Sequence, residues 1–260
     1  MLQLANVRKV FKSATESYVA LDGVNLDVRI GELFCLLGPS GCGKSTVLNI
    51  LAGFEQASSG SASANGTPIR GAGRDRVLFF QDAGSALLPW LTVEENVRFG
   101  LRVRKVARAD WDAIIDKYLK MVDLDRHRGK FPAQLSGGMR QRLQIARALA
   151  VEPAVLLMDE PFAALDALTR RRMHAVLLDI WQSTGKTIVF VTHDIAEAIT
   201  LADRIGIMSV GPRSRISKVI DLNLPRPRDL TNPSVARIFM EIEALLAPDV
   251  ARSEERTLAH

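Results

Sequence analysis

Two hydrophobic periods alternate along this chain and indicate where its strands and helices lie. Residues 1–11 form a strand-like stretch. Short unbroken apolar runs, which are typical of buried strands, cover residues 33–37, 77–80 and 155–158. Further strands are predicted at residues 187–192 and 205–210. Apolar residues alternate with polar ones, as in a half-buried antiparallel strand, at Val24, Leu26, Val28 and Ile30. The Asn65-Gly66 pair predicts a hairpin turn. The first third therefore predicts an antiparallel patch attached to a core of buried strands.

The middle of the chain has the helical period instead. Thr92 and Glu95 fit a capping box that opens a helix, and Ser136 can cap another one. Between these caps, a helical apolar face falls at Trp111, Ile114, Ile115, Tyr118, Leu119 and Val122. No strand pattern occurs over residues 92–151, which predicts an all-helical subdomain inserted into an α/β core.

These patterns divide the chain into four segments. Residues 1–91 carry the antiparallel patch and the first part of the core, and residues 92–151 carry the helical insertion. Residues 152–225 return to the α/β order, with a helix that ends at Gly185. Prolines interrupt the pattern after Leu224, so residues 226–260 are expected to form a C-terminal helix and tail.

The composition narrows the class of protein without choosing a function. A chain of 260 residues with 47% hydrophobic content can bury one large core or two small ones. It has neither an eighteen-residue apolar run nor a signal-peptide pattern, so we expect a soluble protein that is not exported. Cys35 and Cys42 make no disulfide framework and fit a reducing cytoplasm. The net charge of +5 fits nucleic acid, an anionic membrane or a solvated basic face equally well.

The strongest chemical signal is the glycine loop, residues 38–45, which reads Gly-Pro-Ser-Gly-Cys-Gly-Lys-Ser. A buried strand precedes it and a helix follows it, which is the context that this phosphate-binding pattern requires. Glycines allow successive backbone N–H groups to surround a polyphosphate, and the helix N-terminus adds its positive end. Lys44 supplies a mobile positive charge, and the Ser45 hydroxyl can bind Mg²⁺. A glycine-rich turn in an ordinary α/β protein explains neither the Lys-Ser pair nor the two flanks.

Two carboxylates follow the apolar run at residues 155–158. Asp159 would hold Mg²⁺, and Glu160 would face an attacking water as its general base. An isolated Asp-Glu pair is more often a solvated turn, but the glycine loop in the same chain favours the functional interpretation.

A second anion site is predicted where Ser136, Gly137 and Gly138 open a helix. One nucleotide can use both anion sites only if they converge. His193 follows a strand end, where a histidine is more often a capping or packing residue than a functional one. The collection of motifs favours a functional role.

In this order, the motifs resemble the nucleotide-binding subunit of an ATP-binding-cassette (ABC) transporter over most of residues 1–225. The resemblance implies a P-loop NTPase (RecA-like) α/β core and the cofactors ATP and Mg²⁺. It assigns nucleotide binding to Phe11, Gly38, Pro39, Ser40, Gly41, Cys42, Gly43, Lys44, Ser45, Thr46, Ser136, Gly137, Gly138 and Asp166. It assigns the metal to Ser45, Gln81 and Asp159, and catalysis to Glu160, His193, Gln81 and Lys44. The chain departs from the family pattern at Met139 and Ala163, which puts the turnover rate in question.

The resemblance also implies partners and a location. Two copies are expected to form a head-to-tail homodimer around ATP, on the cytoplasmic side of the cell membrane. Two transmembrane permease subunits and an extracytoplasmic solute-binding protein would complete the complex, and no nucleic acid is expected. Residues 71–76, 81–90 and 95–97 resemble importer subunits for taurine, aliphatic sulfonates and nitrate, with the taurine type closest. Another small anion or organic solute is the alternative.

The sequence also argues against two other classes of protein. DNA-repair ATPases with this cassette interrupt it with long heptad coils, and none lies between Ser45 and Asp159. Translation ATPases carry two cassettes, whereas this length holds one. A small GTPase or kinase would leave residues 136–138 unexplained, and no Asn-Lys-x-Asp guanine motif is present.

Two further side chains carry specific expectations. Cys42, in a loop at a helix N-terminus beside Lys44, is expected to be more reactive than Cys35, which lies in a buried strand, and to be protected by Mg-ATP. Trp90, with Leu88 and Pro89, is expected either to receive a permease helix or to pack in the core.

Overall fold

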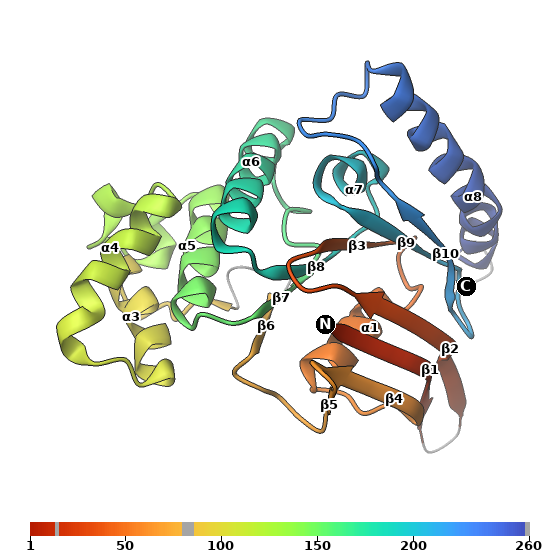
Figure 1. The fold of residues 1–260 in the computed structure, drawn as a ribbon, viewed down its shortest axis with the longest axis horizontal. Coiled ribbons are helices and arrows are strands. Elements are labelled where there is room, and N and C mark those ends of the chain that lie inside the picture. The colour runs from red at the N-terminus through yellow and green to blue at the C-terminus, as the bar shows by residue number, and fades with distance from the viewer. Residues whose placement is uncertain (14–15, 80–85, 258–260) are drawn as a thin grey trace. The chain divides into compact units, whose positions relative to one another are not determined.

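The computed structural model describes residues 1–13, 16–79 and 86–257 and divides into two compact units (Figure 1). The first unit comprises residues 1–72 and 187–260, and the second comprises residues 73–186. The strands of the first unit are β1 (Leu2–Lys12), β2 (Ser17–Val28), β3 (Leu33–Leu37), β4 (Ser59–Ala64), β5 (Thr67–Pro68), β8 (Thr187–Thr192), β9 (Arg204–Met208) and β10 (Ile216–Asp221). Its helices are α1 (Lys44–Ala52), α7 (Ile195–Leu201) and α8 (Pro233–Thr257).

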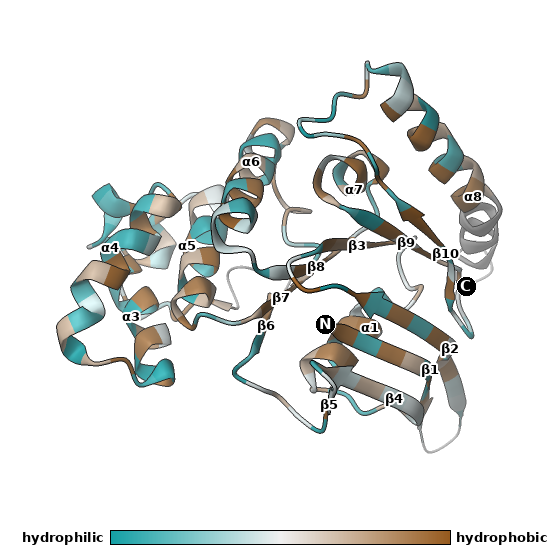
Figure 2. Ribbon diagram, viewed as in Figure 1, coloured by the Kyte–Doolittle hydropathy of each residue, from teal (hydrophilic) through white to brown (hydrophobic). Residues whose placement is uncertain are grey.

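The antiparallel patch predicted for the first unit is confirmed as a sheet in the order β2-β1-β4-β5. Figure 2 shows β1 and β2 alternating between hydrophobic and hydrophilic residues, and Val24, Leu26 and Val28 are buried. The prediction for Ile30 was wrong, because this residue lies in the turn after β2 and is 77% exposed. The Asn65-Gly66 hairpin is confirmed between β4 and β5, with both residues at positive φ.

A second group of strands in the first unit supplies its core. β3 pairs in parallel with both β8 and β9, and every residue of β3 and β8 is buried. β10 pairs antiparallel with β9, and the sequence did not predict this strand. Most of its residues are exposed or half-buried, so it lacks an apolar period, and its hydrogen bonds to β9 hold it in place.

The second unit holds the predicted helices. Its elements are β6 (Arg76–Phe79), α3 (Val93–Arg104), η1 (Arg108–Asp110), α4 (Trp111–Met121), η2 (Asp125–His127), η3 (Pro132–Gln134), α5 (Gly137–Ala150), β7 (Val155–Asp159) and α6 (Ala167–Thr184). β6 and β7 pair in parallel, and the helices α3 to α5 lie between them in the chain. Reciprocal hydrogen bonds between Thr92 and Glu95 confirm the capping box. Phe80, the last residue of the predicted strand 77–80, lies outside the described residues, and the boundaries of the four sequence segments stay a prediction.

The close approach of Gly53 to Gly71 predicts how much an alanine at residue 53 would destabilise the fold. Gly53 ends α1 at φ 83°, and a Cβ added there would lie 2.1 Å from the carbonyl oxygen of Gly71. Gly66 has a similar φ of 78° but has nothing within 4 Å of an added Cβ. Both alanine variants should lose about 1 kcal/mol of unfolding free energy from the left-handed backbone. Gly53→Ala should lose at least about 1 kcal/mol more in urea denaturation because the added methyl collides with backbone. Equal losses in the two variants would contradict the close approach at Gly53.

Candidate functional site

Close packing shapes the glycine loop at the start of α1. A Cβ at Gly38 would lie 2.9 Å from Cys42 Sγ and 3.2 Å from the carbonyl oxygen of Met208. A Cβ at Gly43 would lie 2.8 Å from a methyl of Leu21, and Gly43 has a φ of 91°. Space therefore disfavours a side chain at both positions, and at Gly43 the left-handed backbone favours glycine as well.

Lys44 is the buried cation of this loop. Its side chain folds back so that Nζ donates hydrogen bonds to the carbonyl oxygens of Gly38, at 2.7 Å, and Pro39, at 2.9 Å. Lys44 is only 5% exposed, whereas the neighbouring Ser45 is exposed and Thr46 is half-buried. A bound anion can exchange with these carbonyl contacts, because an ammonium group has three donors on a flexible stem.

The N-terminus of α1 leaves its positive end to an external anion. No side chain caps this helix, and its first turn contains no acidic residue. By contrast, α3 places Glu94 and Glu95 in its own first turn. Since the first N–H groups of any α-helix lack acceptors within the helix, α1 presents donors and a positive dipole end together. Ser40 and Gly41, which precede the helix in the loop, are exposed.

Cys42 does not have the exposed position that its sequence context suggested. The residue is 1% exposed, and its sulfur lies against Gly38 on the inner side of the loop. The expectation of an accessible reactive thiol at Cys42 was therefore wrong: the turn that frees the backbone of the loop directs this side chain into the protein. Cys35 is also buried, and burial raises the pKa of its thiol well above the ordinary value.

Phe11 lies near the end of β1 and is 40% exposed. The Lys9 ammonium sits 4.9 Å from the centre of its ring. Hydrogen bonds to Glu55 Oε2, at 2.5 Å, and to the carbonyl oxygen of Gln56, at 2.9 Å, hold Lys9 in place. One face of the ring thus meets a fixed cation, and the exposed remainder is accessible to a stacking partner.

His193 follows the last residue of β8 and is exposed, so the core-packing interpretation does not apply to it. The next residue, Asp194, caps α7 by accepting a hydrogen bond from the Glu197 amide at 3.1 Å. The Asp194 amide in turn donates to Thr192 Oγ1 at 3.0 Å. These bonds on both sides fix the backbone that carries the histidine.

The second predicted anion site is at the start of α5, within the second unit. Ser136 caps this helix, and its Oγ accepts a hydrogen bond from the Met139 amide at 3.3 Å. Ser136 and Gly137 are exposed, and the first turn of α5 contains no acidic residue. A Cβ at Gly138 would lie 2.6 Å from the Thr169 methyl of α6. This helix start resembles that of α1. In both, glycines precede or open the helix, and no carboxylate in the first turn offsets the positive end of the helix dipole.

The acidic residues predicted for the site lie around the end of β7. Asp159 is the last residue of the strand, and Glu160 follows at a φ of 43°, which is uncommon outside glycine. Both are half-buried.

Asp166 caps α6 and accepts hydrogen bonds from the amides of Leu168, at 3.1 Å, and Thr169, at 3.0 Å. These bonds, with that from Thr169 contributing most, lower the pKa of Asp166 from its ordinary value.

The predicted metal ligands are divided between the units. Ser45 belongs to the first unit and Asp159 to the second, while Gln81 lies outside the described residues. Across residues 1–13, 16–79 and 86–257, no group of three His, Cys, Asp or Glu side chains could hold a metal by itself. Mg²⁺ bound with a nucleotide takes oxygens from phosphates and water and needs only one or two protein ligands, so this donor set fits it.

In the same part of the chain, no helix is both long and apolar enough to cross a membrane.

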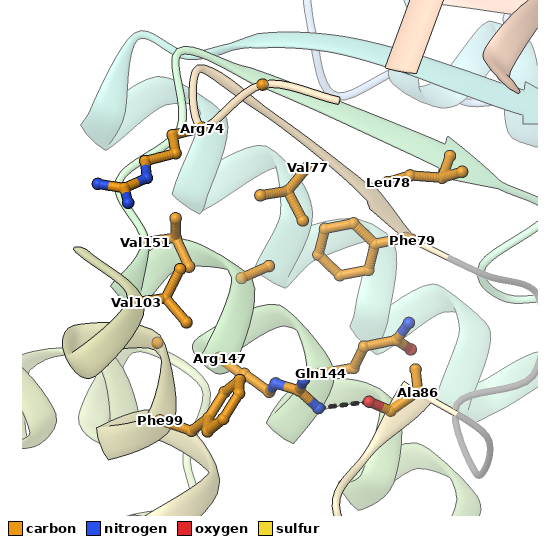
Figure 3. A pocket seen from close by; sticks show the side chains of 13 residues that line it. Arg74, Val77, Leu78, Phe79, Ala86, Phe99, Val103, Gln144, Arg147 and Val151 are labelled. Atoms are coloured by element: carbon orange, nitrogen blue, oxygen red, sulfur yellow. Dashed lines mark hydrogen bonds between the residues drawn. The ribbon is translucent and has the colours of Figure 1, made fainter. Parts of the chain in front are cut away.

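An apolar pocket of about 430 Å³ opens within the second unit, and Figure 3 shows Val77, Phe79, Val103 and Val151 around it. Arg147 crosses its floor, donates a hydrogen bond to the carbonyl oxygen of Ala86, and stacks at 5.3 Å from the centre of the Phe99 ring. Burial lowers the pKa of Arg147 from its ordinary value. The sequence motifs do not indicate this pocket, because its lining residues come from separate elements that share no sequence pattern.

Two residues that shape the glycine loop were also missed. Leu21 and Met208 pack against Gly43 and Gly38, and they belong to β2 and β9. As ordinary apolar strand residues far from the loop in sequence, they carry no local signal.

Comparison with known proteins gives a consistent result. The family model described as "ABC transporter" matches residues 21–163. The nitrate import ATP-binding protein NrtD of Synechococcus elongatus is 42% identical over 86% of this chain and 81% of its own length. The bicarbonate transport ATP-binding protein CmpD of Synechocystis sp. is 45% identical over 88% of this chain and 81% of its own length.

A solved structure extends the match to the fold. The ATP-binding cassette MJ0796, as a dimer bound to ADP and Pi after hydrolysis, superimposes with a TM-score of 0.75 at 33% identity, covering 86% of this chain and all of that one. The P-loop NTPase fold expected from the motifs is thereby confirmed. The match across the glycine loop and the Asp159-Glu160 pair, together with these relatives, shows that the chain belongs to the ABC transporter family, as an ATP-binding subunit that hydrolyses ATP with Mg²⁺.

Proposed function

We propose that this subunit powers the import of a small sulfonate or inorganic anion, and that its glycine loop and Lys44 hold the ATP phosphates. The main support is the structure of the loop. Lys44 Nζ donates hydrogen bonds to two carbonyl oxygens of the loop. The helix that follows has neither a side-chain cap nor an acidic residue in its first turn. The backbone N–H groups of residues 38–46 surround the phosphates, and Phe11 stacks on the adenine. Ser45 and Asp159 hold Mg²⁺, together with Gln81.

The hydrolytic step uses the chain's own carboxylate. Bound Mg-ATP supplies the phosphoanhydride bond and the metal that offsets its negative charge. Glu160 accepts a proton from the attacking water, whose oxygen bonds to the terminal phosphorus as the bond to the ADP oxygen breaks. His193 hydrogen-bonds to the terminal phosphate, and Lys44 neutralises the charge that moves toward ADP.

The second anion site completes the nucleotide site from another copy of the chain. Ser136, Gly137 and Gly138 of one copy bind the terminal phosphate held by Lys44 of the other copy, in a head-to-tail homodimer. Asp166, which caps α6, lies in the turn that follows the acidic pair and adds a contact at the same nucleotide. The MJ0796 cassette forms a dimer with bound ADP and Pi, which supports this arrangement.

The solute proposed for the transporter is taurine or another aliphatic sulfonate. NrtD and CmpD are named for nitrate and bicarbonate, which supports a small solute with an anionic oxygen group and leaves the solute itself as a proposal. Two transmembrane permease subunits and an extracytoplasmic solute-binding protein complete the importer, with this chain at the cytoplasmic face. The exposed Trp90 and the apolar pocket in front of Phe99 and Arg147 are the surfaces proposed to receive a permease helix.

Glu160→Gln tests the hydrolytic role. The change removes the proton acceptor and keeps the side-chain size, so steady-state ATP hydrolysis should fall about 10²–10⁴-fold. ATP affinity, measured by calorimetric titration, should stay near that of the unmodified protein. Asp179→Asn, an amide substitution at an exposed position of α6, is the control and should leave both quantities unchanged. Near-normal turnover in Glu160→Gln would remove Glu160 from this role.

Trp90→Ala tests the docking surface in the assembled importer. Trp90 is 70% exposed, so its loss should leave the isolated subunit folded, with unchanged melting temperature and basal hydrolysis. In membranes that contain the permease, hydrolysis stimulated by the loaded solute-binding protein should fall at least about tenfold. Stimulation is expected with taurine and is compared with nitrate and bicarbonate in the same assay.

Phe131→Ala, which removes another exposed aromatic ring of the same unit, is the matched control and should keep the stimulation. Full stimulation in Trp90→Ala would refute docking at this residue. Stimulation by nitrate or bicarbonate alone would refute the sulfonate proposal and leave the anion importer standing.

A further inference from the structure

Two exposed aromatic side chains face each other across the β1–β2 hairpin. Phe11 and Tyr18 are direct partners in the antiparallel register, so they project from the same face of the sheet. Phe11 is 40% exposed and Tyr18 is 47% exposed. None of the motifs in the chain includes Tyr18, and the hydrolytic step described above does not use it.

The Tyr18 hydroxyl reaches from this hairpin to the border of the glycine loop. It lies 3.1 Å from the position that a Cβ of Gly211 would take, and the same position is 3.6 Å from the carbonyl oxygen of Gly41. The same position is 3.1 Å from Ser214 Oγ, so Gly211 lies close to the Tyr18 hydroxyl, to Ser214 and to the glycine loop. A side chain at residue 211 would push against the hydroxyl.

Backbone hydrogen bonds fix this arrangement. The Arg213 amide donates to the carbonyl oxygen of Val19 at 2.8 Å, and the Ser214 amide donates to that of Ala20 at 3.1 Å. The Asp22 amide completes the ladder with a 3.0 Å bond to the carbonyl oxygen of Ser214. The segment that contains Gly211 is thus tied to β2, the strand that carries Tyr18.

The position of Tyr18 has a consequence for any nucleotide in this unit. A nucleotide with its phosphates in the glycine loop and its base on Phe11 must place its sugar between these two ends. Tyr18 is adjacent to Phe11 through the strand register and to Gly41 through Gly211. Its phenol therefore lies beside the path of the nucleoside, with a hydroxyl that can donate or accept a hydrogen bond.

We propose that Tyr18 is a further nucleotide-binding residue, whose ring packs on the nucleoside and whose hydroxyl bonds to its ribose. This inference rests on the proposed binding of ATP by Phe11 and the glycine loop. Phe11 has no hydroxyl, so within this aromatic pair Tyr18 supplies the polar group. The residue is expected to affect nucleoside recognition and to leave the phosphate contacts of Lys44 unchanged.

The test compares two probes, Mg-ATP and Mg-bound inorganic tripolyphosphate, by calorimetric titration. Tyr18→Phe should weaken ATP binding about three- to tenfold, the effect of one lost hydrogen bond. Tyr18→Ala should weaken it by about tenfold or more, because the ring contact is lost as well. Tripolyphosphate has no nucleoside, so its affinity should not change in either variant. Tyr118→Phe changes the chain's other tyrosine, which is buried and bonded to Glu152 in the second unit, and should leave both affinities unchanged.

Nitration by tetranitromethane gives an independent readout. The exposed Tyr18 should be nitrated, Mg-ATP should protect it, and tripolyphosphate should not. Unchanged ATP affinity in both Tyr18 variants would overturn the inference, and so would an equal loss for tripolyphosphate. An unmodified chain that binds neither probe would instead overturn the proposed function, together with this inference.

Discussion

The proposed nucleotide site depends on backbone N–H groups that no side chain covers, at the starts of the helices α1 and α5. A phosphate can approach the N–H groups of a helix N-terminus only where no Cβ and no carboxylate stands in the way. At the start of α1, an added Cβ would collide with Cys42 Sγ at Gly38 and with a Leu21 methyl at Gly43. At α5, Gly138 meets the Thr169 methyl in the same way. These glycines are close-packed, and in the proposed function the same residues leave the backbone N–H groups open to the phosphates.

Lys44 adds the charge that the backbone alone lacks. Its contacts with the carbonyl oxygens of Gly38 and Pro39 keep the ammonium beside the loop, and the side chain is almost fully buried. The ammonium therefore does not need to be recruited from solvent when a polyphosphate arrives, and little side-chain entropy remains to be lost. This pre-organisation links the fold of the first unit to its chemistry.

Much of the fold and of the candidate site could be predicted because the signals are local. The capping box at Thr92, the cap at Ser136 and the strand before the glycine loop each depend on neighbouring residues. The errors came from tertiary packing. Ile30 continues an alternating pattern but falls in a turn, and the sequence beside Cys42 says nothing of the direction of its side chain.

Other features had no sequence signal to find. The edge strand β10 depends on hydrogen bonds to β9, and the contact of Tyr18 with Gly211 joins residues nearly two hundred positions apart. The apolar pocket of the second unit likewise forms only when β6, α3 and α5 pack together. Such features need the whole chain, because each residue involved is unremarkable among its neighbours.

In the proposed dimer, the two helix starts act on one nucleotide shared by two copies of the chain. The molar mass of Glu160→Gln, measured by size-exclusion chromatography with light scattering in Mg-ATP and in ADP, tests this arrangement. We expect a dimer with Mg-ATP and a monomer with ADP, because only ATP carries the terminal phosphate that Ser136 is proposed to bind. Adding Ser136→Arg should abolish the dimer, whereas Ser183→Arg, an exposed position near the end of α6, should keep it. A dimer that forms with either nucleotide, or that survives Ser136→Arg, would show that the two helix starts do not share one nucleotide.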